Sequence, residues 1–280
     1  MNPRDFQTLI KVRITGLVTL TAVAGYGLAP EPVWGAPLVS VLVGVFLITA
    51  GASVVNMFME RRTDALMNRT RLRPLPQKVI SPAAALGMGA ALSLAGVVAL
   101  LPVGPAPTSI AVASWILYVL VYTPLKARTS LNTVVGAIPG ALPPLIGWTA
   151  TGAPLTMVAL LPFLLMVAWQ IPHFLALAWM YREDYAKGGL QMLSVQDAEG
   201  TMVGRQALLY AICLIPITAA PLMARDASLV GVALGVGLSL VFVGFAARFA
   251  RHRDRKTAAS LFGVSLLYLP CAFVAMFLSR

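Results

Sequence analysis

Charged side chains are scarce in this sequence. They make up 11% of its 280 residues, less than half of the share that is usual in soluble globular proteins. Hydrophobic residues account for 59% of the chain, and the mean hydropathy is +0.83. This composition excludes a water-soluble domain and places the chain in a lipid bilayer.

Apolar stretches long enough to cross a hydrocarbon core, roughly 17 to 25 residues, occur about nine times. They are 14–30, 37–58, 81–102, 108–124, 132–150, 156–180, 206–224, 228–247 and 259–278. We therefore expect an all-α, polytopic membrane protein in which about nine transmembrane helices form a single bundle. Residues 1–280 are expected to be one domain.

Cysteine is nearly absent as well. Cys213 and Cys271 both lie within apolar stretches and show no C-x-x-C spacing, so neither a disulfide framework nor a metal site is indicated. The first apolar stretch is long for a signal peptide and lacks a convincing cleavage site, so we expect it to be retained as a span. No mitochondrial-type presequence precedes it, which favours a bacterial plasma membrane.

The basic residues are distributed unevenly between the two sides. If the N-terminus is inside and nine spans alternate, 19 of the 21 Lys and Arg residues fall in inside segments, and only Arg225 and Arg280 fall outside. Lys and Arg are retained on the cytoplasmic side of short loops, so this pattern predicts an inside N-terminus and an outside C-terminus. The same rule accounts for the net charge of +11, which therefore does not indicate nucleic-acid binding.

Acidic residues are absent from the middle of every predicted span. Ion-coupled transporters usually place an ionisable group near the bilayer midplane, and channels need a polar pore lining. The acids gather instead in two inside segments that contain Glu60, Asp64, Glu183, Asp184, Asp197 and Glu199.

The first acidic segment has helical spacing. Asn56, Glu60 and Asp64 recur at i, i+4 and i+8, so they share one face if the second span continues through them. Two carboxylates and an amide oxygen, open to solvent on one side, suit Mg²⁺, which usually keeps positions for water and substrate phosphates. Arg69, Arg71 and Arg73 follow with fork-shaped donors for phosphate oxygens. The alternative is an ordinary helix at the membrane surface whose acids offset its arginines.

Two further inside loops supply complementary groups. Glu183 and Asp184 precede Gly188-Gly189, a pair that permits a tight turn or close approach to a ligand. Lys126 and Arg128 lie between the fourth and fifth spans, although anchoring at the membrane surface explains them equally well. Together the two acidic clusters would hold a diphosphate between them through metal ions.

The sequence resembles the UbiA-type intramembrane prenyltransferases and, among them, the protoheme IX farnesyltransferases, also called heme O synthases. The likeness covers nearly the whole chain. Its motifs are N-x-x-x-E-x-x-x-D-x-x-M-x-R-T-x-x-R-P at 56–74, Y-T-P-L-K-A-R-T-S-L-N at 122–132 with the Gly and Pro residues up to 148, and W-Q-I-P-H-F at 169–174 leading to Asp184. Glu60 stands where the family more usually has Asp, Gly188 removes the second D-x-x-x-D, and Val12 replaces the Pro of K-P-R.

The resemblance implies a farnesyl transfer from farnesyl diphosphate to a vinyl group of heme b. It implies Mg²⁺ held by Asn56, Glu60, Asp64 and Asp184, and diphosphate bound by Arg69, Arg73, Lys126 and Arg128. His173 and Tyr122 are the expected acceptor-binding residues, although His173 is equally well explained by a hydrogen bond to a nearby backbone carbonyl. The expected partners are the lipid bilayer and, through a functional link, heme A synthase and terminal oxidase assembly.

Two other functions stay open at this stage. One is a prenyltransferase that acts on an aromatic or chlorin acceptor, and the other is a transporter or lipid-binding membrane protein without catalysis.

Overall fold

The computed structural model describes residues 1–223 and 227–279, and its secondary structure within these ranges is entirely helical, which confirms the all-α prediction. The elements are α1 (Pro3–Leu9), α2 (Val12–Gly27), α3 (Ala36–Leu66), α4 (Pro82–Leu100), η1 (Leu101–Val103), α5 (Pro105–Ile116), η2 (Leu117–Tyr122), α6 (Thr123–Leu125), α7 (Asn132–Ala141), α8 (Pro143–Thr149), α9 (Met157–Met180), α10 (Arg182–Lys187), α11 (Leu193–Gln196), α12 (Thr201–Ala219), η3 (Ala220–Met223), α13 (Leu229–His252) and α14 (Arg255–Leu278).

Seven helical segments of the described residues are, by length and composition, able to cross a membrane, and α1 with α2 makes an eighth if this pair, bent by 51°, is one span. The predicted span 132–150 folds instead as α7 and α8. Pro143 and Pro144 have no N–H to donate, and the α-helical hydrogen bonding is interrupted there. The count of nine spans is therefore not confirmed. Arg225, Asp226 and Arg280, which belong to the predicted outer side, lie outside the described residues.

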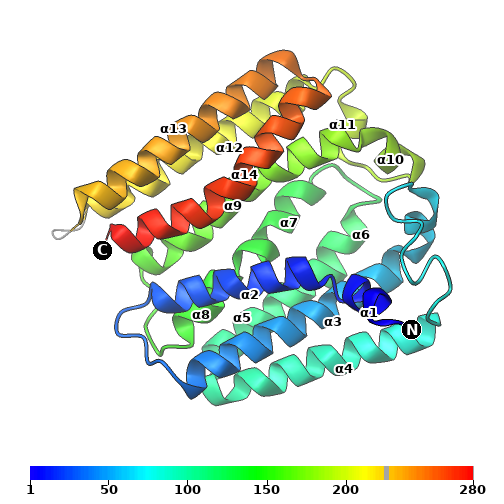
Figure 1. The fold of residues 1–280 in the computed structure, drawn as a ribbon, viewed down its shortest axis with the longest axis horizontal. Helices are drawn as coiled ribbons and strands as arrows, with labels where there is room; N and C mark the ends of the chain where they lie inside the picture. The colour runs from blue at the N-terminus through cyan, green and yellow to red at the C-terminus, as the bar shows by residue number, and fades with distance from the viewer. Residues whose placement is uncertain (224–226, 280) are drawn as a thin grey trace.

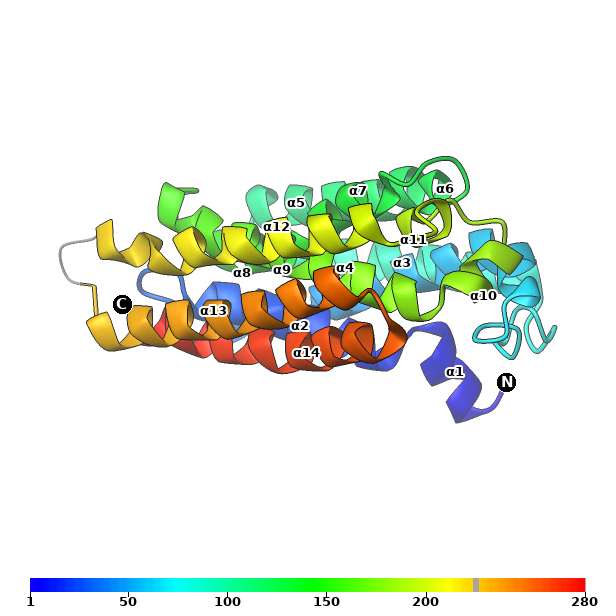
Figure 2. The same cartoon turned by 90° about the horizontal axis from the view of Figure 1, so that it is seen from above.

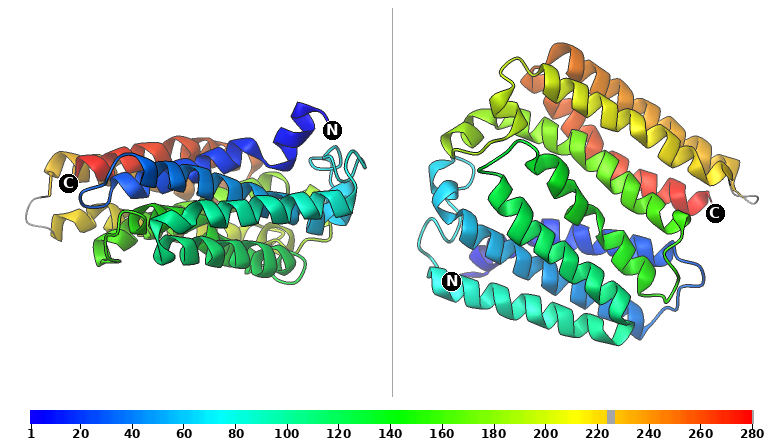
Figure 3. Two further views of the ribbon diagram at one scale, coloured as in Figure 1. Left: turned by 90° about the horizontal axis from the view of Figure 1, so that it is seen from below. Right: turned by 180° about the vertical axis from the view of Figure 1, so that it is seen from behind.

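The long helices run side by side as one elongated bundle (Figures 1 and 2). The N-terminal α1, the segment after α3, α6, α10, α11 and the turn between α13 and α14 all gather at one end of it, which we call the loop end. The C-terminal part of α14 lies at the opposite end, and α1 projects from the bundle at the loop end (Figure 3). The predicted site segments therefore share one end of the molecule.

Close backbone contact joins α2 to α8. A Cβ atom built on Gly25 would lie 2.0 Å from the carbonyl oxygen of Pro144, and one built on Gly147 would lie 1.8 Å from that of Ala22. These distances are far below ordinary van der Waals contact, so only glycine permits the two helices to approach this closely.

Candidate functional site

The polar face of α3 forms the centre of the candidate site. α3 continues for 31 residues to Leu66, which confirms that Asn56, Glu60 and Asp64 belong to one unbroken helix. Asn56 and Asp64 are fully buried, and the side chain of Glu60 is 14% exposed. The expectation that these oxygens open to solvent on one side is wrong, because a basic side chain contacts one oxygen of each residue and the second oxygen of Asp64 is buried.

Each polar residue of this face is held by one cation. Lys126 Nζ lies 2.7 Å from Glu60 Oε1, Arg73 Nη1 lies 2.7 Å from Asp64 Oδ2, and the amine of Lys11 donates to Asn56 Oδ1 at 2.7 Å. The first two contacts are the only salt bridges found in the described part of the chain. Burial would lower the pKa of Lys126, but the negative charge of Glu60 outweighs it and holds that pKa above its usual value.

Lys11 is a site residue that the sequence predictions did not include. It lies between α1 and α2 with a left-handed backbone (φ 49°), and this bend brings its side chain back to α3. The signal that pointed to it was the run Lys11-Val12-Arg13, which is similar to the family's K-P-R.

The loop that carries Lys126 enters the site through a π-helix, η2. Such π-helical turns are rare and are often found at functional sites. The rings of Tyr118 and Tyr122 lie 5.6 Å apart, and Lys126 Nζ lies 4.5 Å from the centre of the Tyr122 ring. Thr123 accepts a hydrogen bond from the amide of Asn56 at 2.9 Å. Two of the predicted residues, Lys126 and Tyr122, are therefore adjacent to the α3 face.

Arg128 lies farther out on the same loop. It is exposed, and no hydrogen bond or salt bridge joins its side chain to any residue that the structure describes.

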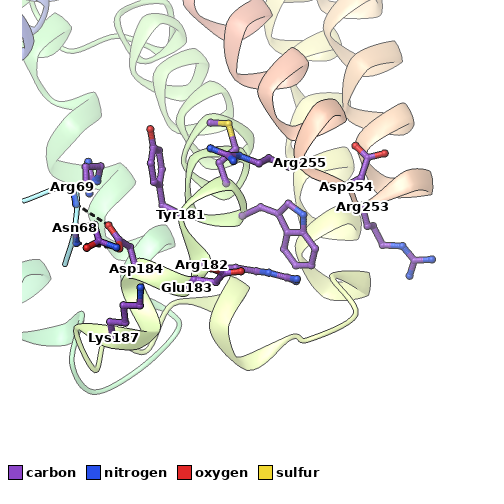
Figure 4. Close-up of a pocket in the computed structure, with 12 residues that line it drawn as sticks. Asn68, Arg69, Tyr181, Arg182, Glu183, Asp184, Lys187, Arg253, Asp254 and Arg255 are labelled. Carbon is purple, nitrogen blue, oxygen red and sulfur yellow. Dashed lines mark hydrogen bonds between the residues drawn. The ribbon is translucent and has the colours of Figure 1, made fainter. Parts of the chain in front are cut away.

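The second acidic segment meets the first directly. Asp184 Oδ1 accepts the backbone N–H of Asn68 at 3.1 Å, and Oδ2 accepts that of Arg69 at 2.9 Å (Figure 4). Gly188 packs closely against the end of α3, since a Cβ there would lie 3.1 Å from the side chains of Thr63 and Met67. Partial burial would raise the pKa of Asp184, but the two N–H donors and the charges of Lys187 and Arg69 hold it below its usual value.

Arg69 is oriented by aromatic residues rather than by an acid. Its guanidinium lies 5.2 Å and 5.6 Å from the ring centres of Tyr181 and Tyr185, and it donates to the Tyr185 hydroxyl at 3.2 Å. The guanidinium forms no salt bridge within the described residues, although the charge of Asp184 lies near it, and it can therefore still contact an anionic ligand.

His173 lies deeper in the bundle on α9. Its Nδ1 is 2.6 Å from the hydroxyl of Ser265 on α14, and its ring stacks between those of Trp169 (5.0 Å) and Phe262 (4.7 Å). The partner is thus a hydroxyl group of another helix, not the backbone carbonyl that we considered as the plain alternative. Acceptor binding by His173 stays a prediction.

The donor set of the α3 face fits Mg²⁺. Asp64 Oδ1 is buried and has no hydrogen-bond partner, which leaves a hard oxygen available to a cation. Within the described ranges no three Asp, Glu, His or Cys side chains converge as a ready-made site. Mg²⁺ does not require one, because it is commonly held by one or two carboxylates and by substrate phosphates.

Comparison with known proteins identifies the family of the chain. The family model of the UbiA prenyltransferase family matches residues 18–278. The protoheme IX farnesyltransferase of Solibacter usitatus is 39% identical over 99% of this chain and 99% of its own length. The human mitochondrial protoheme IX farnesyltransferase is 36% identical over 98% of this chain and 62% of its own length.

Solved structures share the fold at low sequence identity. A digeranylgeranylglyceryl phosphate synthase superposes with a TM-score of 0.82 at 17% identity, covering 99% of this chain and 97% of its own. A UbiA homologue from Archaeoglobus fulgidus, bound to GPP and Mg²⁺, gives a TM-score of 0.71 at 16% identity, covering 98% and 99%.

Proposed function

Because the chain belongs to the UbiA prenyltransferase family, we propose that it is a protoheme IX farnesyltransferase. It transfers the farnesyl group of farnesyl diphosphate to a vinyl group of heme b, with addition of water, and releases heme O and diphosphate. The observation that carries this proposal is the 39% identity to a protein of that name over 99% of both chains.

The main catalytic task is to stabilise the charge that develops on diphosphate as the allylic C–O bond breaks. Mg²⁺, held by Asn56, Glu60, Asp64 and Asp184, would neutralise part of that charge when bound. The proposed direct donors to the phosphate oxygens are Arg69, Arg73, Lys126 and Arg128. Since Arg73 and Lys126 already contact Asp64 and Glu60, they lie beside any phosphate that these carboxylates hold through a metal ion.

The other half of the reaction needs an apolar site without water. A farnesyl chain gains about 0.8 kcal/mol for each methylene removed from water, which favours binding among the helices. Tyr118 offers an aromatic face that would stabilise the allylic cation, whereas the Tyr122 ring already has the Lys126 amine 4.5 Å from its centre. Phe58 is less suited to this role, because the guanidinium of Arg61 already covers its ring at 4.3 Å.

The remaining assignments follow from this function. The chain is a multi-pass membrane protein, and we place it in a bacterial plasma membrane with the loop end facing the cytoplasm. Residues 1–280 act as one intramembrane prenyltransferase domain. Its product would supply the heme A synthase step and terminal oxidase assembly.

Co-expression with a terminal oxidase, in cells that lack their own heme O synthase, tests the reaction. Extracted heme should contain heme O, and purified protein should lose activity with a chelator and regain it with Mg²⁺. Recovery of heme B alone, in cells shown to contain farnesyl diphosphate, would contradict the proposal.

A further inference from the structure

A cavity of about 600 Å³ opens at the loop end of the bundle, beside the α3 face. Three regions line it: the segment after α3, the end of α9 with α10, and the turn between α13 and α14 (Figure 4). The cavity shares Arg69 and Asp184 with the proposed diphosphate site, but its lining does not include Glu60, Asp64 or Lys126. It is therefore a neighbouring compartment.

Positive charge dominates this cavity. Five cationic side chains line it, namely Arg69, Arg182, Lys187, Arg253 and Arg255. The acidic lining residues are Glu183, Asp184 and Asp254. None of the five cations takes part in a salt bridge within the described part of the chain, where only Arg73 and Lys126 form one.

Two of the three acids are already engaged. Asp184 accepts the backbone N–H groups of Asn68 and Arg69. Asp254 caps α14, accepting the Thr257 N–H at 2.7 Å and the Thr257 hydroxyl at 2.9 Å. Five cations against three acids leave the lining with a net charge of +2, which favours an anionic ligand.

The cavity wall also has a part made of two aromatic residues and a methionine. Trp179, Met180 and Tyr181 line it at the end of α9, and the guanidinium of Arg182 lies 4.5 Å over the Trp179 ring. A ligand that fits such a lining has an anionic edge and an apolar, flat body.

The helices that flank the cavity lead to the predicted acceptor residue. His173 precedes Met180 on α9 by seven residues, and Phe262 follows Arg255 on α14 by seven, which is about 10 Å along either helix. The rings of His173 and Phe262 stack at 4.7 Å. The α9–α14 pair thus connects the cationic cavity to the aromatic stack in the bundle.

We propose that this cavity binds the carboxylate groups of the tetrapyrrole acceptor. The inference rests on the proposed function and adds to it a recognition site for the acceptor's two propionates. Cations supplied by three separate regions suit a ligand with two separated negative groups, whereas the cations that pair with Glu60 and Asp64 lie beside the proposed diphosphate position.

Lys187 and Arg255 are the best residues to change. Both are exposed, and neither side chain makes a hydrogen bond or salt bridge to another described residue. Asp184, whose pKa the charge of Lys187 helps to lower, keeps its two backbone N–H donors when Lys187 is changed. The matched control is R251Q/K256Q, which removes two charges from the same region at positions that do not line the cavity.

The experiment is a spectroscopic titration of the purified full chain, in neutral-lipid nanodiscs, with heme b and with heme b dimethyl ester. We expect heme b to bind more tightly than the diester. K187Q/R255Q should weaken heme b binding by about threefold to tenfold, as expected for two solvent-exposed charge contacts. It should leave diester binding unchanged, and R251Q/K256Q should bind both ligands like the unmodified protein.

Equal binding of heme b and its diester, or equal effects of the two double variants, would overturn the proposal. An increased KM for farnesyl diphosphate in K187Q/R255Q, with heme b binding unchanged, would assign the cavity to the donor instead. If the unmodified protein binds heme b in neutral-lipid nanodiscs but not in nanodiscs with anionic lipid, the cavity would be assigned to lipid headgroups instead.

Turnover at saturating heme b separates this proposal from the proposed function. Heme O formation without the expected binding pattern rejects the cavity and leaves the reaction intact. The binding pattern without heme O formation keeps the cavity as a heme site and rejects the reaction.

Discussion

Asp64 has the most asymmetric environment of the candidate residues. One of its carboxylate oxygens accepts a hydrogen bond from Arg73 at 2.7 Å, while the other is buried and has no partner. A buried, unpartnered carboxylate oxygen is costly, and a bound cation would remove that cost. Among the acids of α3, Asp64 is therefore the one whose free oxygen most directly favours a metal ion.

Substitution of Asp64 by Asn tests this role with little change in shape. D64N removes the negative charge and should lower kcat for heme O formation by about a hundredfold or more, equivalent to about 3 kcal/mol of lost transition-state stabilisation. The measurement is heme O produced per mole of purified, membrane-inserted protein. E199Q, an exposed acid at the same end, is the control and should keep full activity.

Equal activity of D64N and E199Q would contradict the role of Asp64. If D64N reduces the amount of membrane-inserted protein, the second variant to measure is Asp64→Glu. It keeps the charge and should restore insertion and part of the activity.

The sequence predicts some residue contacts well and misses others. It places Asn56, Glu60 and Asp64 correctly on one helix because contacts at i+4 depend only on local geometry. It misses the contact of Lys11 with Asn56 because the two residues are 45 positions apart and meet only through the bend before α2. It misses the salt bridge between Lys126 and Glu60 for the same reason, since Lys126 approaches from another loop.

At the level of elements, α2 and α8 are held together through their backbones. The space beside Gly25 is filled by the carbonyl of Pro144, and a helix backbone cannot give way as a flexible side chain can. Gly16 lies in the same helix, and a Cβ atom built on it would have no atom within 4 Å apart from its chain neighbours and the adjacent backbone of its own helix. Alanine substitutions at Gly25 and Gly16 therefore distinguish the effect of packing on stability from the effect of helix propensity within α2.

G25A should reduce the free energy of unfolding by about 1 to 3 kcal/mol, the usual cost of overpacking a tight core. G16A should leave it unchanged or raise it by about 0.5 to 1 kcal/mol, since alanine favours a helix over glycine. Thermal unfolding in detergent, followed by circular dichroism, measures both. A G25A variant as stable as G16A would show that α2 and α8 do not approach this closely.

Element boundaries follow from the sequence where hydropathy and charge change together. The prediction 156–180 agrees with α9 at Met157–Met180 to within one residue, because a charged segment follows directly. The division of 132–150 into α7 and α8, and the π-helical η2, were not predicted. Hydropathy measures how apolar a segment is, and it contains no information on where hydrogen bonding is interrupted or shifted.

At the scale of the whole molecule, the candidate site exists only because distant segments share one end of the bundle. Asn56 lies on α3, Lys126 directly follows α6, and Asp184 lies on α10. The C-terminal end of α3, α6 and α10 all lie at the loop end (Figure 1). The described basic residues predicted to be inside lie in the same segments. If positive charge in short loops fixes the orientation of the protein, the basic residues in the site segments also determine which side of the membrane the site faces.

Site-directed cysteine labelling tests that orientation. In a background with Cys213→Ala and Cys271→Ala, Glu199→Cys reports on the loop end, and Leu155→Cys reports on the opposite end, between α8 and α9. A membrane-impermeant maleimide should label Leu155→Cys in intact spheroplasts and Glu199→Cys only after lysis or in inverted vesicles. Heme O formation by both variants serves as the control for correct folding.

The inverse labelling pattern would place the site on the outer face, where cytoplasmic farnesyl diphosphate and Mg²⁺ do not reach it directly. Labelling of both positions from one side would mean that the bundle does not cross the membrane between them. Either result would contradict the proposed orientation and leave the fold unaffected, since α3, α9 and the Asp184 contact would be unchanged. The substrate would then have to reach the site by another route.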